Sequence, residues 1–133
     1  MKYFILSMSI FLMACGAQKS PSNLKNVSDY IKIISPTPFG EVSDLLVITG
    51  EAKGTYYFEG EFPVTIIAED GSKIDHYAVA QDAWMTEKFV PFRVEIDISH
   101  LAPQEILVKL HRNNPSEKRN LDMVLELPLI ITE

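Results

Sequence analysis

A two-residue hydrophobic period over residues 92–98 restricts the fold of this chain more than any other feature. Phe92, Val94, Ile96 and Ile98 are apolar, and each residue between them is charged. Successive side chains of a β-strand point to opposite faces, so the pattern predicts a strand with one buried and one wet face. An amphipathic helix would need apolar residues three and four positions apart, and no segment shows that spacing convincingly.

Six other segments carry strand signals. They cover residues 30–35, 45–52, 62–68, 73–80, 106–110 and 123–127. Asp70-Gly71, just before the fourth of these, is the strongest short hairpin signal in the chain. Half-apolar strands at spacings of about 8–12 residues are typical of two packed antiparallel sheets. The length of 133 residues and the 47% hydrophobic content suit one such domain. We therefore expect an all-β sandwich of about seven strands over residues 30–133.

The N-terminal residues 1–14 have the features of a signal peptide. Lys2 supplies a positive charge, a short apolar run follows over residues 3–12, and a small residue, Ala14, comes next. The run is shorter than the roughly 20 apolar residues that a membrane-spanning helix needs. Removal of this segment would leave a mature protein that starts at Cys15.

Cys15 ends the tetrapeptide Leu12-Met13-Ala14-Cys15, which resembles the bacterial lipobox. The resemblance implies that the thiol accepts a diacylglycerol and that the new N-terminus is acylated again, for example with palmitate. Two or more chains form a stable anchor, whereas one chain binds only marginally. The alternative is an ordinary secretory signal in which Cys15 is incidental. Because Cys15 is the only cysteine, an intramolecular disulfide is impossible.

Residues 15–29 are rich in small and polar residues without an apolar period, and they predict a flexible tether. The residue after the cysteine, Gly16, differs from the aspartate that retains lipoproteins in the inner membrane. By this resemblance we expect an extracytoplasmic, lipid-anchored protein of the cell envelope, at the outer membrane if the organism has one.

Several short motifs of the predicted domain resemble a known family. They are Thr49-Gly50-Glu51-Ala52-Lys53-Gly54, Tyr56-Tyr57-Phe58-Glu59, Phe62-Pro63-Val64, Asp70-Gly71, Trp84-Met85-Thr86, Phe89-Val90-Pro91-Phe92 and Asn114-Pro115-Ser116. Together they resemble the immunoglobulin-like domain of bacterial spore germination, over residues 31–131. The resemblance implies an immunoglobulin-like antiparallel β-sandwich, found in extracytoplasmic and lipid-anchored bacterial proteins, with no established catalytic residues to transfer.

The densest chemical cluster is aromatic: Tyr56, Tyr57 and Phe58 in one loop, Phe62 soon after, then Trp84, Phe89 and Phe92. Loops gather at the two ends of a sandwich, so residues 56–58 and 84–89 are expected to meet. Their chief members, Tyr56, Tyr57, Phe58 and Trp84, are candidates for a stacking platform for sugars or a contact point for a protein. The alternative is that the rings plug the end of the core, since aromatic side chains dominate small cores.

Asn114 and Pro115 are the second candidate binding site. Asn tolerates left-handed backbone and Pro fixes φ, so the pair fits a shaped turn, while the length of the loop fits a recognition role. Both interpretations stay open from the sequence.

Catalysis and metal binding have little support. The carboxylates near the aromatics are Glu51, Glu59, Glu61, Asp82 and Glu87. Such a group is compatible with a glycosidase pair or with Ca²⁺, but no Asp-x-Asp-x-Asp-Gly loop is present. The three histidines show no metal-ligand spacing, and no nucleophile elbow occurs. We therefore expect no enzyme, no catalytic residues, no metal and no cofactor.

Charge argues against nucleic acid as a partner. The formal net charge is −6, and loss of the signal peptide leaves 11 of the 12 basic residues against 18 acidic ones. A phosphate backbone repels such a surface. A local basic patch comprises Lys109, His111, Arg112, Lys118 and Arg119. It is either a solvated face or a contact for an acidic partner.

These features together predict a non-catalytic binding or assembly module held at the envelope. The expected partners are the membrane, through the lipid anchor, and an envelope protein or a cell-wall glycan. The alternatives are a purely structural lipoprotein that acts as a spacer or cap, and a calcium- or glycan-binding domain. The sequence does not predict an oligomeric state.

Overall fold

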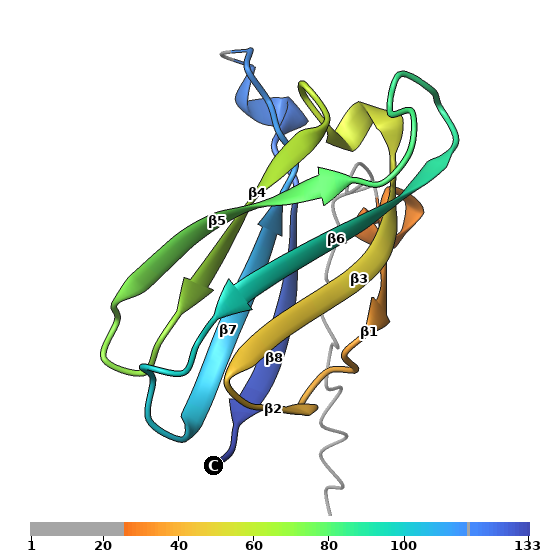
Figure 1. Ribbon diagram of the computed structural model, residues 1–133. Helices are drawn as coiled ribbons and strands as arrows, with labels where there is room; N and C mark the ends of the chain where they lie inside the picture. Colours follow the sequence, from red (N-terminus) through yellow and green to blue (C-terminus); the bar gives the residue numbers. More distant parts are fainter. Residues whose placement is uncertain (1–25, 117) are drawn as a thin grey trace, which may run out of the picture.

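The computed structural model describes residues 26–116 and 118–133, which form eight strands and three short 3-10 helices (Figure 1). The strands are β1 (Ile31–Ser35), β2 (Glu41–Val42), β3 (Leu45–Lys53), β4 (Glu61–Ile67), β5 (Lys73–Ala80), β6 (Phe89–Asp97), β7 (Gln104–His111) and β8 (Val124–Ile131). The 3-10 helices are η1 (Val27–Asp29), η2 (Gly54–Tyr56) and η3 (Arg119–Leu121). In this part of the chain, no helix has the length and hydrophobicity required to cross a membrane.

The eight strands belong to one curled sheet with the order β1-β3-β6-β5-β4-β7-β8-β2. The curl brings the β1–β3–β6 layer over the β4–β7–β8 layer, and β5 connects the two (Figure 1). β5 pairs with β4 along its length, but with β6 only at Val79 and Ala80. All pairings are antiparallel except that of β2 with β8. The expected all-β, immunoglobulin-like sandwich is therefore confirmed, with its layers joined into a single sheet.

All seven expected strands are present, and β2 is an eighth. β2 has only two residues, too few to display a hydrophobic period, which is why the sequence did not predict it. The Asp70-Gly71 hairpin is also confirmed. Gly71 has a φ of 84°, and the Ser72 amide donates to the Asp70 carboxylate at 2.9 Å.

Burial follows the two-residue period closely. In β6, Val90, Phe92, Val94 and Ile96 are buried, while the residues between them are exposed. Removing each such side chain from water stabilises the fold by about 1.5–3 kcal/mol. Gly50 of β3 faces the same core, and a Cβ there would lie 2.7 Å from the Phe92 ring. The missing side chain therefore leaves room for the Phe92 ring, which lies opposite Gly50 in the β3–β6 pairing.

The segment expected to be a tether ends inside the folded domain. Residues 26–29 contain η1, whose Val27 packs against the core, and the Asn26 side chain accepts a hydrogen bond from the Ser28 amide at 3.3 Å. The signal peptide, Cys15 and the rest of the predicted tether lie outside the described residues.

Candidate functional site

Three connections gather at one end of the sandwich, at the top of Figure 1: residues 54–60, residues 81–88, and residues 112–116 with 118–123. Main-chain hydrogen bonds join them. The Gly54 amide donates to the Lys88 carbonyl at 3.2 Å, and the Asn113 amide donates to the Tyr56 carbonyl at 2.9 Å. We call this region the loop end. It holds Tyr56, Tyr57, Phe58, Trp84, Asn114 and Pro115, so the structure brings together the loops that the sequence singled out.

Tyr56 and Tyr57 point into the core and offer no exposed ring face. They are 0% and 4% exposed, and both rings lie about 5 Å from that of Phe62, at 5.1 and 5.3 Å between centroids. The Tyr56 hydroxyl donates to the Leu110 carbonyl at 2.6 Å, and the Tyr57 hydroxyl to the Val90 carbonyl at 2.7 Å. Burial raises the pKa of both phenols above the ordinary value, and for Tyr56 the nearby Arg112 charge opposes the rise. These two rings plug the core, as in the alternative interpretation.

Phe58 leaves the core through a tight turn. Glu59 and Gly60 both have positive φ, 53° and 80°, and Phe58 and Glu61 exchange main-chain hydrogen bonds at 3.0 and 3.2 Å. Two successive positive φ values are the signature of a type I′ turn. The turn leaves Phe58 42% exposed, directly beside the two buried tyrosines.

Trp84 and Met85 lie on the adjacent connection. The Trp84 indole is half-buried against the turn, since a Cβ on Gly60 would lie 3.4 Å from its Cδ1 atom. Met85 is 84% exposed, the largest value among the exposed large apolar residues of the described chain. The sequence offered Met85 only as part of a motif, because a single methionine in a loop carries no hydrophobic period.

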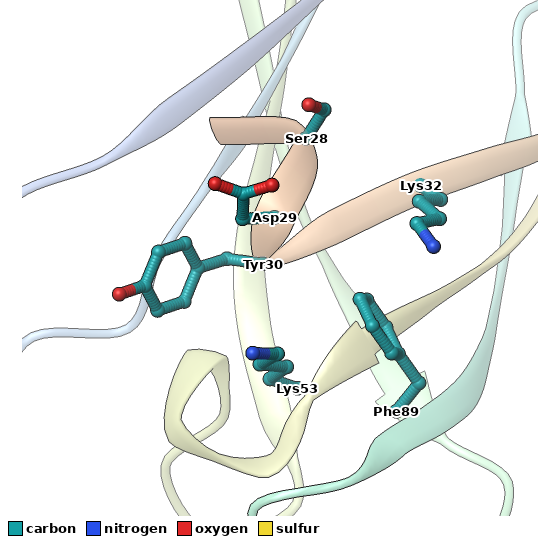
Figure 2. Close-up of a pocket in the computed structure, with 6 residues that line it drawn as sticks. All are labelled: Ser28, Asp29, Tyr30, Lys32, Lys53 and Phe89. Atoms are coloured by element: carbon teal, nitrogen blue, oxygen red, sulfur yellow. The ribbon is translucent and has the colours of Figure 1, made fainter. Parts of the chain in front are cut away.

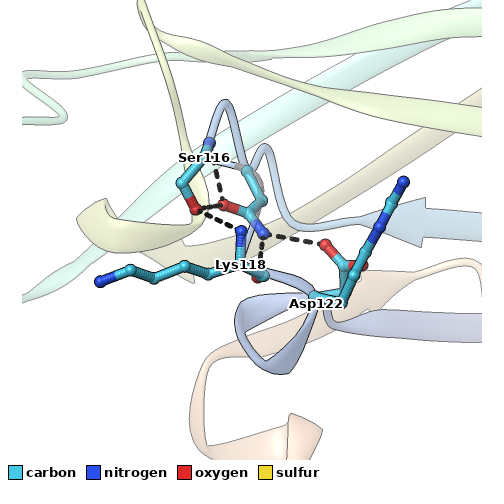
Figure 3. Close-up of polar contacts among 5 residues, drawn as sticks. Ser116, Lys118 and Asp122 are labelled. Atoms are coloured by element: carbon cyan, nitrogen blue, oxygen red, sulfur yellow. Dashed lines mark hydrogen bonds and ion pairs between the residues drawn. The ribbon is translucent and has the colours of Figure 1, made fainter.

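Asn114 builds its own loop through hydrogen bonds to Ser116, Lys118 and Asp122, the three residues labelled in Figure 3. Its Nδ2 donates to the Lys118 carbonyl at 3.0 Å and to the Asp122 carboxylate at 2.9 Å. Its Oδ1 accepts from the amide and the hydroxyl of Ser116, at 3.2 and 2.6 Å. Pro115 projects from this frame and is exposed. The geometry supports the turn interpretation for Asn114 and leaves Pro115 available for contact.

A family model for the immunoglobulin-like domain of bacterial spore germination matches residues 30–118. The chain belongs to this family. The match stops before β8, yet β8 pairs with the whole of β7 and completes the fold. No curated protein and no solved structure matches the chain. A domain of this family suggests a non-catalytic binding or structural module.

Among the described residues of this immunoglobulin-like domain, no three His, Cys, Asp or Glu side chains are placed to hold a metal ion. The carboxyl groups with a distinct shift, Asp70 and Asp97, have a lowered pKa because Ser72 and Ser99 donate hydrogen bonds to them. A general acid requires the opposite shift.

The basic patch of the last hairpin is largely engaged within the domain. Arg112 donates to the carbonyls of Thr55 and Leu121, at 3.0 and 3.2 Å. Arg119 pairs with Asp122 at 3.6 Å. Burial, followed by the charge of Lys109, lowers the pKa of His111. The patch thus helps to hold the loop end together.

Proposed function

We propose that this protein is a membrane-anchored extracytoplasmic lipoprotein whose immunoglobulin-like domain is a non-catalytic binding or assembly module at the cell envelope. Acylated Cys15 is the anchor in this proposal, and the loop end is the surface that contacts a partner. The partner class that fits best is an envelope protein.

The observation that carries the proposal is the pair of exposed apolar side chains on adjacent loops, Phe58 and Met85. Single exposed apolar residues are common on any protein. These two, however, flank the half-buried Trp84 on a rigid frame, and aromatic and methionine side chains are enriched where proteins meet. A cell-wall glycan fits less well, because sugar stacking needs open ring faces and two of the four predicted rings are buried.

Crosslinking in intact envelopes tests the binding surface. The acylated full chain is compared with the double variant Phe58→Ala/Met85→Ala and with Tyr77→Ala/Val79→Ala, which removes two exposed apolar residues of β5 instead. We expect a stoichiometric crosslinked partner in the wild type and in the β5 variant, and its loss in the loop-end variant. Equal crosslinking in all three proteins would contradict the proposal.

Cys15→Ala tests the anchor independently. Acylation of Cys15 predicts a membrane-bound protein that incorporates labelled palmitate, and the variant is expected to lose both the label and the membrane fraction. A Cys15→Ala protein that stays in the membrane fraction, or a wild type without label, would overturn the lipoprotein assignment.

A spacer or cap is the second candidate, and the internal bonding of the loops favours it. The polar side-chain groups of Tyr56, Tyr57 and Asn114 all form hydrogen bonds within the domain. Absence of any partner that depends on Phe58 and Met85, in envelopes where the wild type is correctly anchored, is the outcome expected of a spacer.

A further inference from the structure

A pocket of about 450 Å³ lies where the chain enters the domain, and it takes no part in the loop-end proposal (Figure 2). It is lined by Ser28, Asp29, Tyr30, Lys32, Lys53 and Phe89. The residues come from η1, from the start of β1 and from the paired ends of β3 and β6, where Lys53 is opposite Phe89. We call it the entry pocket.

The ammonium groups of Lys32 and Lys53 both lie close to the ring of Phe89 in the entry pocket. The Lys32 Nζ lies 4.4 Å from the centroid of Phe89, and the Lys53 Nζ lies 5.7 Å from the same centroid and 5.4 Å from that of Tyr30. These are cation–π distances, which hold each ammonium in place while its N–H groups stay available. Figure 2 shows the Asp29 carboxylate on the Ser28 side of the pocket, across from Phe89.

The other cationic pocket of the domain provides a contrast. It is lined by Arg112 and Arg119, which are bound to carbonyls and to Asp122. Neither Lys32 nor Lys53 forms an ion pair with a described residue, although Glu51 is opposite Lys32 in the β1–β3 register. The lysines of the entry pocket are therefore free to meet an external anion.

The position of the entry pocket indicates which anion it meets. Ser28 follows Cys15 by thirteen positions, a span that reaches at most about 45 Å when fully extended. Lys19 and Lys25 precede it on the same segment, which has only Asp29 as an acid. Since the chain as a whole is acidic, an anionic membrane repels most of the domain and attracts the part that holds the entry pocket.

We propose that the entry pocket binds the phosphate of a phospholipid headgroup in the membrane that carries the anchor, and so sets the orientation of the domain. This inference rests on the proposed lipid anchor. In it, Lys32 and Lys53 donate to the phosphate oxygens, and the Ser28 hydroxyl is a third donor at the rim of the pocket.

Amine footprinting of the acylated full chain tests the pocket. Lysine acylation rates are measured by mass spectrometry in phosphatidylglycerol–phosphatidylethanolamine vesicles and in maltoside micelles, which contain no phosphate. We expect Lys32 and Lys53 to react about fivefold more slowly in vesicles. The exposed Lys73, on the opposite end of the domain, is expected to react equally in both. Equal rates for all three lysines would overturn the proposal.

Matched variants and a phosphate titration separate the remaining outcomes. Lys53→Gln is expected to remove most of the protection of Lys32, whereas Lys73→Gln carries the same charge change and is expected to preserve it. Inorganic phosphate added to the micelles tests the anion site alone. Protection by inorganic phosphate without protection in vesicles would overturn the membrane assignment, and loss of the partner crosslink at the loop end would not affect either result. If Cys15 proves not to be acylated, the anchor fails, and the lipid assignment fails with it.

Discussion

The two main connections at the loop end are held by different forces. Residues 54–60 are held by buried aromatic rings, because Tyr56 and Tyr57 pack against Phe62 in the core. Residues 112–116 and 118–123 are held by the hydrogen bonds of polar side chains, chiefly those of Asn114 and Arg112. In both connections, a residue next to one of these supporting side chains is exposed. It is Phe58 in the first connection and Pro115 in the second. A partner that binds the loop end can thus contact two connections whose stability depends differently on mutation and on pH.

Phe62→Ala should have the largest effect, because it removes the ring on which the first connection rests. Phe62 is fully buried and contacts the rings of Tyr56, Tyr57 and Phe92, the last at 5.0 Å. Such a truncation costs about 3–5 kcal/mol of unfolding free energy. Urea denaturation of the full chain measures it, and Tyr77→Ala, at an exposed position of β5, is the control. A loss as small as that of the control would mean that the rings do not support the loop.

Gly54→Ala is expected to destabilise the same connection from its other side. A Cβ at this position would overlap the main-chain carbonyl oxygens of Trp84 and Thr86, which leaves the loops no room to stay together. Overpacking of this kind costs about 1–3 kcal/mol. Gly71→Ala is a useful comparison, since a Cβ there meets nothing within 4 Å and the cost comes only from its φ of 84°. A smaller loss for Gly54→Ala than for Gly71→Ala would contradict the packing argument.

The strands and their inward faces were predictable because a period of two repeats over many residues. Residues 92–98 alone specify which side of β6 is buried, and the structure agrees at every position. The fate of the aromatic loop was not predictable in this way. Tyr56, Tyr57 and Phe58 are consecutive and chemically alike, yet the two tyrosines are buried and Phe58 is exposed next to the type I′ turn at Glu59-Gly60.

The turn and the entry pocket were not predictable from the sequence, for two different reasons. Glu-Gly is a weaker turn signal than Asn-Gly, so the local sequence did not predict positive φ at Glu59 and Gly60. Lys32, Lys53 and Phe89 meet only through the β1–β3–β6 register, which brings together residues far apart in the chain. Candidate residues found by motif therefore came from the loops, and the pocket became visible only in the assembled sheet.

Alkaline pH should weaken the first connection selectively. Burial raises the pKa of Tyr57 in the folded state. Below about pH 10, the ordinary pKa of tyrosine, both states keep the proton and stability does not depend on this group. Above it the unfolded chain releases the proton first, so the free energy of unfolding falls. Tyr57→Phe is expected to lose about 1–2 kcal/mol at neutral pH, because the Val90 carbonyl is left unpaired. The variant is also expected to show a smaller alkaline decline, to which the buried Tyr56 still contributes. An unchanged alkaline slope in the variant would argue against a buried phenol.

Asn114→Ala probes the second connection and should have a smaller effect than the tyrosine change. It removes the hydrogen bonds to Lys118, Asp122 and Ser116, all near the surface, at a cost of about 1 kcal/mol. Pro115→Ala, at the exposed neighbour, should change stability by no more than about 0.5 kcal/mol. Urea denaturation and envelope crosslinking are measured for both variants. Together they distinguish a residue that only stabilises the loop from one that contacts the partner. Loss of the crosslink in Pro115→Ala at full stability would make this loop part of the partner surface. A retained crosslink in both variants would confine that surface to Phe58 and Met85.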